Sequence, residues 1–212
     1  MKSNLRILIF SVAILIAHPP VIHALEKDHL EVPPHAFVTP GIINTYGISV
    51  QNILMKDANS RPYAGMVVLP SFEPEWMVTV AFPQNGWAEV QYIVVDKIIW
   101  ANVNKDDIKQ IIKKAQIPED LAQEIKDVWT KMLFDVHYSR NPGLGLDGTV
   151  YYFIAFDEKA GPLIGTKWSP KEKSAAGQMV AIGDMLKDYV LAENSSRDEI
   201  SKKIRQSVRK FK

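Results

Sequence analysis

Apolar and polar positions alternate in several parts of the chain. In EWMVTVAF, residues 75–82, the large side chains of Trp76, Val78, Val80 and Phe82 occupy every second position. A period of two is typical of a β-strand, because successive side chains point to opposite faces of a sheet. This segment therefore predicts a strand.

Other short apolar runs, rich in β-branched and aromatic residues, predict further strands. They are GISVQNILM (47–55), GMVVL (65–69), AEVQYIVVDKIIWANV (88–103), TVYYFIAF (149–156) and PLIGTKW (162–168). The run at 88–103 is long enough for one strand or two. Pro83, Asn85 and Gly86 predict a hairpin loop between the strand at 75–82 and this run.

Four segments have apolar residues at helical spacing instead. Their stripes are Ile108, Ile111, Ile112 and Ala115; Leu121, Ile125, Val128, Met132 and Val136; Met179, Ile182, Leu186, Tyr189 and Val190; and Ile200, Ile204, Val208 and Phe211. Asn104, Pro118 and the capping-box pattern at Ser169 mark the first three starts, and the last helix is expected from about Asp198. The strands and helices together predict a single α+β domain, with a mostly antiparallel sheet of about five to six strands packed with about four helices.

The N-terminus has the pattern of an export signal. Two positive residues precede an apolar run from Ile7 to Ala17, and a small residue, Ala24, offers a cleavage site. The run is shorter than the ~20 residues that a membrane helix needs. We therefore predict a cleaved signal peptide at residues 1–24, a periplasmic or secreted location, and no membrane span after cleavage. Residues 25–47, rich in Pro and Gly, predict an extended arm, and residues 48–212 the folded domain.

The chain has no cysteine. This excludes thiol nucleophiles, zinc–thiolate sites and cysteine-bound iron–sulfur clusters. An exported chain without disulfides fits a bacterial periplasmic protein better than a eukaryotic secreted one.

Positive charge is concentrated at the C-terminus, although the formal net charge of the chain is only +1. Six of the last eleven residues are basic: Lys202, Lys203, Arg205, Arg209, Lys210 and Lys212. Lys203 and Arg209 are therefore candidate contacts for an acidic partner protein or a lipid headgroup surface, while export argues against nucleic acid. The alternative is a solvated helix whose narrow apolar stripe docks only weakly on the domain.

A glycine motif, G-x-G-x-x-G, occurs at Gly143, Gly145 and Gly148. Phosphate binding by this motif requires a strand before the loop and a helix after it, so that helix amides point at the phosphate. Here the predicted order is reversed. We therefore interpret the glycines as parts of turns, and we predict neither a nucleotide nor another cofactor.

Residues beside this loop could carry chemistry. His137 with the carboxylate of Asp147 could perform general acid–base catalysis, and Tyr138 and Arg140 are candidate binding residues. In the alternative interpretation, His137 and Arg140 contact the last carbonyls of the preceding helix and Asp147 shapes its own turn. His137 is the only histidine outside the predicted signal and arm, so a site with several histidines, and hence a bound metal, is not expected.

Two glutamates and two tryptophans complete the candidates. Glu73 and Glu75 lie two residues apart, so an extended backbone would point both carboxylates the same way. Such a pair could hydrolyse a glycosidic bond, although exposed glutamates beside a proline are also common in soluble loops. Trp87 and Trp168 stand at the edges of predicted elements and are candidates for an exposed binding surface.

These observations favour an exported, non-catalytic binding or interaction protein, of accessory or inhibitor type, that contacts another envelope protein. The alternative is an envelope hydrolase that uses His137 with acidic residues. No G-x-S-x-G, H-E-x-x-H or Walker pattern occurs that would support nucleophilic or metal catalysis.

Overall fold

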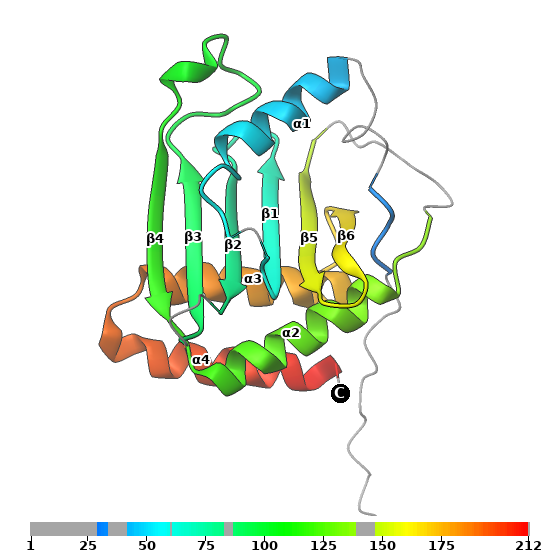
Figure 1. The fold of residues 1–212 in the computed structure, drawn as a ribbon, viewed down its shortest axis with the longest axis vertical. Coiled ribbons are helices and arrows are strands. Elements are labelled where there is room, and N and C mark those ends of the chain that lie inside the picture. Colours follow the sequence, from blue (N-terminus) through cyan, green and yellow to red (C-terminus); the bar gives the residue numbers. More distant parts are fainter. Residues whose placement is uncertain (1–28, 34–41, 60, 83–86, 139–146, 212) are drawn as a thin grey trace, which may run out of the picture.

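A six-stranded antiparallel sheet forms the centre of the protein in the computed structural model (Figure 1). The structure describes residues 29–33, 42–59, 61–82, 87–138 and 147–211. Across the sheet the strands are β4 (Gln110–Gln116), β3 (Glu89–Val95), β2 (Trp76–Ala81), β1 (Ala64–Pro70), β5 (Thr149–Asp157) and β6 (Gly161–Trp168). Each strand is antiparallel to its neighbours. The predicted α+β class, with its antiparallel sheet, is confirmed.

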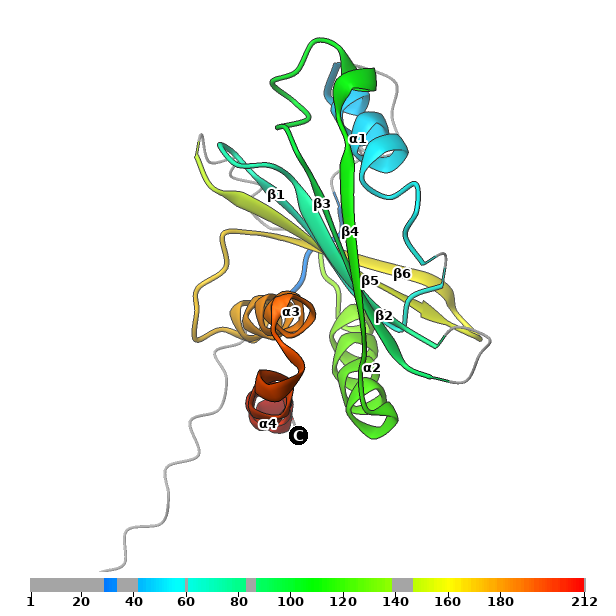
Figure 2. The same ribbon diagram turned by 90° about the vertical axis from the view of Figure 1, so that its left-hand side faces the viewer.

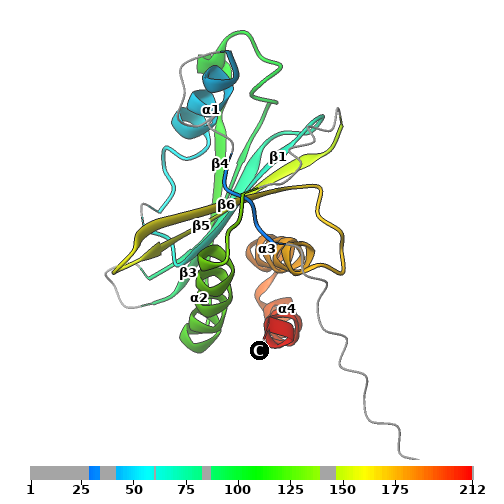
Figure 3. The same ribbon diagram turned by 90° about the vertical axis from the view of Figure 1, so that its right-hand side faces the viewer.

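The described residues form four α-helices, three of which lie on the sheet while the fourth, at the C-terminus, packs on two of the others. They are α1 (Ile42–Ile53), α2 (Glu119–Phe134), α3 (Ala175–Leu191) and α4 (Asn194–Val208). Figures 2 and 3 show α1 on one side of the sheet and the other three helices on the opposite side. Among the described residues, no helix has both the length and the apolar character needed to cross a membrane.

The period of two divides each central strand between two cores. In β1, Met66 and Val68 belong to the main core under α2, α3 and α4, whereas Val67 and Leu69 belong to a smaller core under α1. A strand covered on both faces has no need of polar positions. This explains why GMVVL is apolar throughout rather than alternating.

The segment 47–55 is helical, so the strand predicted there was wrong. It forms the second half of α1 and the turn after it. Val50 and Leu54, four residues apart, are both buried against the sheet. The short apolar run is therefore one face of a helix, a case that periodicity alone does not separate from a buried strand. The helix begins at Ile42, within the segment expected to be an extended arm.

The helix predicted at 104–115 was also wrong. Asn104 caps only a short 3-10 turn, Lys105–Asp107, and residues 110–116 form edge strand β4. Ile111 and Ile112 are 48% and 40% exposed, so their helical spacing does not reflect a buried helix face. Pairing with β3 along the whole strand satisfies the backbone instead. The run at 88–103 contains a single strand, β3.

The later elements follow the prediction more closely. Helices α2 and α3 and strands β5 and β6 lie where they were expected. The predicted capping box at Ser169 was wrong, because Ser174 caps α3 by accepting a hydrogen bond from the Gly177 amide. Ser169 instead has a positive φ of 37° and pairs with Thr149, which continues the β5–β6 ladder. The last helix begins at Asn194 rather than near Asp198.

The C-terminal helix docks firmly, contrary to the weak docking expected from its narrow stripe. Ile204 and Val208 are fully buried in the main core. Arg205 donates hydrogen bonds to Asp120 and Glu124 of α2, at 2.8 and 3.2 Å. Helix α4 packs mainly on α2 and α3. Some of its basic residues pair with acidic ones.

Candidate functional site

Three exposed aromatic side chains gather at the end of the sheet where β1 ends and β5 begins. Phe72 lies just after β1, Trp100 lies in the turn after β3, and Trp168 is the last residue of β6. We call these three residues the aromatic end. Their exposed fractions are 70%, 53% and 42%, which is unusual for side chains this large and apolar.

A hydrogen bond ties Trp100 to one point at this end of the sheet, the contact between Ser71 and Gly148. The Ser71 hydroxyl donates to the Gly148 carbonyl at 2.7 Å and accepts from the Gly148 amide at 3.1 Å. The Trp100 indole donates to the Ser71 carbonyl at 3.1 Å. Strands far apart in the sequence are thus joined at a fixed point.

Gly148 also sets the position of Trp168. Its φ is +153°, and a Cβ at this residue would lie 2.7 Å from Trp168 Nε1 and 2.6 Å from Ser169 Oγ. Only glycine therefore allows the indole to lie against this turn. The prediction that this glycine serves a turn that leads into a strand is confirmed: α2 precedes the loop and β5 follows it. Gly143 and Gly145 lie outside the described residues.

Glu75 supports the turn that carries Trp100. It is fully buried, and its carboxylate accepts hydrogen bonds from the Tyr46 hydroxyl at 2.9 Å and the Ile99 amide at 2.8 Å. Burial, and next the nearby Glu75 charge, raise the pKa of Tyr46. Lys105 closes the same turn by donating to the Ile99 and Asn102 carbonyls.

The glutamate pair expected from the sequence does not form. Glu73 is exposed while Glu75 is buried, because residues 71–75 form a bend between strands and not an extended segment. The two carboxylates therefore cannot share one substrate. Glu73 and the exposed Asp147 instead lie next to the aromatic end in sequence, two residues from Ser71 and one from Gly148.

His137 lies elsewhere, just beyond α2. Its Nε2 is 3.1 Å from Asp135 Oδ1, and His29 Nδ1 is 3.1 Å from Asp135 Oδ2. Hydrogen bonds from His137, and then from His29, hold the pKa of Asp135 below its usual value. The expectation that His137 is the only histidine of the folded part was wrong, because His29 packs against the domain. These three are the described residues whose donor atoms lie close enough to share a metal ion.

The remaining candidates do not join one site. Tyr138 is 81% exposed beside His137, and Arg140 lies outside the described residues. Lys203 pairs with Glu199 in the next turn of α4, and Arg209 is exposed. None of the hydrogen bonds seen among the described residues connects His137 to Asp147, Glu73 or Glu75.

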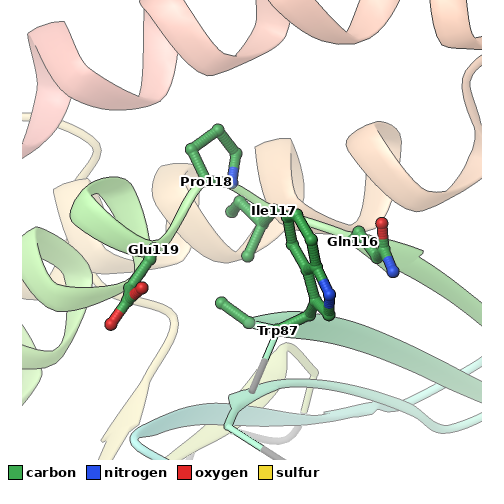
Figure 4. A pocket seen from close by; sticks show the side chains of 6 residues that line it. Trp87, Gln116, Ile117, Pro118 and Glu119 are labelled. Carbon is green, nitrogen blue, oxygen red and sulfur yellow. The ribbon is translucent and has the colours of Figure 1, made fainter. Parts of the chain in front are cut away.

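Trp87, at 63% exposure, stands at the opposite end of the sheet. It lines an open hollow with residues 116–119, where its indole lies beside Ile117 and Pro118 (Figure 4). Trp87 and Trp168, which the sequence predicts to be exposed, are both exposed and belong to two separate surfaces.

Phe72 and Trp100 were missed by the sequence interpretation. Phe72 follows two turn-forming residues, and Trp100 sits at the end of an apolar run that resembles a strand. Only their place in a polar bend or turn could have indicated exposure. Comparisons with protein-family models, curated proteins and solved structures gave no match.

Proposed function

We propose that this is an exported, non-catalytic interaction protein that contacts another envelope protein through its aromatic end. The observation that carries the proposal is that Trp100 and Trp168 are exposed yet held at the single Ser71–Gly148 contact, with the exposed Phe72 following Ser71 directly in the chain. Exposed aromatic groups at one place mark protein contacts far more often than scattered apolar residues do.

The rigidity of the surface supports binding. Ordering side chains on association costs about 0.5–1.5 kcal/mol for each one immobilised. The Trp100 indole is already hydrogen-bonded, and Trp168 is held against Gly148. The free-energy cost of ordering these two side chains when a partner binds is therefore lower.

The chemistry of the border suggests the kind of partner. Glu73 and Asp147 are exposed carboxylates that directly follow Phe72 and directly precede Gly148 in the chain. A partner surface with an apolar centre and basic residues around it would be complementary, because interfaces have apolar cores and polar rims of matched charge.

The hydrolase alternative receives less support. A general base needs a reacting group within hydrogen-bond reach. Among the described residues, the hydrogen-bond partner of the His137 ring is Asp135, and both are exposed. Glu75 is fully occupied by two structural donors.

Affinity capture with matched variants tests the proposal. The mature protein is immobilised as wild type, as a Phe72→Ser/Trp100→Ser double variant, and as Trp87→Ser, which removes an equally exposed aromatic side chain from the opposite end. We expect a protein from the envelope extract to bind wild type and Trp87→Ser, and to bind the double variant at least tenfold less, about 1.4 kcal/mol. Equal capture by the double variant would refute the assignment.

A further inference from the structure

His29, Asp135 and His137 form a compact group that the proposed binding surface does not use. We call it the histidine–aspartate cluster. Two imidazole nitrogens and one carboxylate, from residues up to 108 positions apart in the chain, lie with their donor atoms within 4.8 Å of one another. The two imidazole rings are 4.4 Å apart, edge to face.

The backbone on both sides of the cluster is fixed. The His137 amide donates to the Leu30 carbonyl at 2.9 Å, and the Val32 amide donates to the His137 carbonyl at 3.0 Å. Glu31 exchanges two backbone hydrogen bonds of 2.8 Å with Thr166 of β6. Because Leu30 is fully buried in the main core, His29 is held on the domain whether or not its side chain binds anything.

Close packing at β6 brings these segments together. A Cβ at Gly165 would lie about 3 Å from side-chain atoms of Leu30, Leu133 and Val136, at 3.1, 3.1 and 3.0 Å. The end of α2 and the segment 29–33 approach β6 closely at this glycine, and a larger residue there would require them to move by a few tenths of an ångström.

The distances suit a metal ion. In a tetrahedral site with bonds of about 2.0–2.1 Å, ligand atoms lie about 3.4 Å apart. Asp135 Oδ2 lies 3.1 Å from His29 Nδ1 and Asp135 Oδ1 lies 3.1 Å from His137 Nε2, and one donor atom from each of the three residues lies within 4.8 Å of the other two. A small movement of these three side chains would let one metal ion take the place of the protons in the two imidazole–carboxylate hydrogen bonds.

The charge and exposure of the cluster also suit a cation. As metal ligands, two imidazoles and one carboxylate together contribute a charge of −1, and the side chains are 41%, 62% and 57% exposed for His29, Asp135 and His137. Water can therefore complete the coordination. The nearby Lys167 ammonium is paired with Glu31 at 3.0 Å, so it adds little net positive charge.

We infer that the histidine–aspartate cluster binds one divalent first-row transition metal ion of the zinc class. Imidazole nitrogen with carboxylate oxygen is a donor set for such ions, whereas Mg²⁺ and Ca²⁺ take oxygen ligands. Three protein ligands leave at least one position open.

Calorimetric titration with Zn²⁺, on full-length mature protein free of any histidine tag, tests the inference. Wild type is compared with His29→Gln, His137→Gln and Asp135→Ala. The glutamine variants retain an amide that can donate a hydrogen bond to Asp135 but lose the imidazole. Asp127→Asn, which changes another exposed acid of α2, is the matched control.

We expect one Zn²⁺ per chain, an affinity that falls at least tenfold in each cluster variant, and no change in Asp127→Asn. If the cluster serves only to attach residues 29–33 to α2, the glutamine variants should give the same Zn²⁺ titration as wild type. Absence of binding to wild type, or equal binding by all variants, would overturn the inference. Circular dichroism without metal shows that each variant is folded, which is expected because all three side chains are exposed.

Discussion

Two glycines with positive φ differ in their surroundings. Gly148 faces Trp168 and Ser169, whereas a Cβ at Gly161, with φ of +82°, would meet nothing within 4 Å. We predict that Gly161→Ala lowers the free energy of unfolding by about 1–2 kcal/mol, the cost of the left-handed conformation alone. Gly148→Ala should cost more, because it also displaces Trp168. Urea denaturation measures both; equal losses would mean that Trp168 does not pack against Gly148. No nucleotide should stabilise either variant.

Glu75 and Glu73 form a second matched pair. In Glu75→Gln one of the two donors, Tyr46 or Ile99, would face an amide NH₂ in place of an oxygen. We predict a loss of about 1–3 kcal/mol in the free energy of unfolding. Glu73→Gln should change stability by less than about 0.5 kcal/mol, because the side chain is exposed. Equal effects in thermal or urea unfolding would show that the buried carboxylate is not needed.

The elements show which signals in the sequence were reliable. Helices α2 and α3 were predicted because their stripes continue over several turns and face a core. The errors fell on short elements at the border of the domain. Residues 47–55 form the second half of α1 and the turn after it, with Val50 and Leu54 buried. Ile111 and Ile112 lie on an edge strand with little burial. In both cases pairing with the rest of the molecule, and not local spacing, decides the structure.

Removal of helix α4 should cost more stability than any of these single substitutions. Truncation after Glu193 would remove Ile204, Val208 and Phe211 from the main core. At about 1.5–3 kcal/mol for each buried side chain, the loss approaches the total stability of a typical domain. We predict that the truncated chain does not fold, as measured by circular dichroism and proteolysis.

The charges of α4 offer the control for this truncation. Lys203→Ser/Arg209→Ser alters only exposed basic residues of the C-terminal segment and should leave the thermal midpoint nearly unchanged. A folded truncated protein would instead restore the sequence-based interpretation of a weakly docked helix.

At the scale of the whole molecule, the candidate sites depend on contacts that no local pattern contains. The exposure of Trp168 was predicted from the sequence. Phe72 and Trp100 lie at the same end of the molecule because β1, β3 and β5 belong to one sheet. His29 and His137 meet because Leu30 enters the core. The sequence could indicate which residue types were available, whereas the antiparallel strand order determines which of them meet.

Export is the premise of the proposed function and has its own test. The predicted signal lies outside the described residues. We predict that intact-mass spectrometry of the protein recovered from exporting cells finds a chain beginning at or near Leu25, since the apolar run is short and followed by a small residue at Ala24. An intact N-terminus in the membrane fraction would contradict this.

Site-specific photo-crosslinking in the cells that make the protein tests whether the aromatic end contacts a partner protein. A photoreactive phenylalanine analogue is placed at Phe72 or Trp168 of the aromatic end and, as a control of comparable exposure, at Trp87 of the opposite end. We predict a discrete crosslinked protein of the same mass from Phe72 and Trp168, and none from Trp87. Crosslinks from Trp87 alone, or the same products from all three positions, would contradict it.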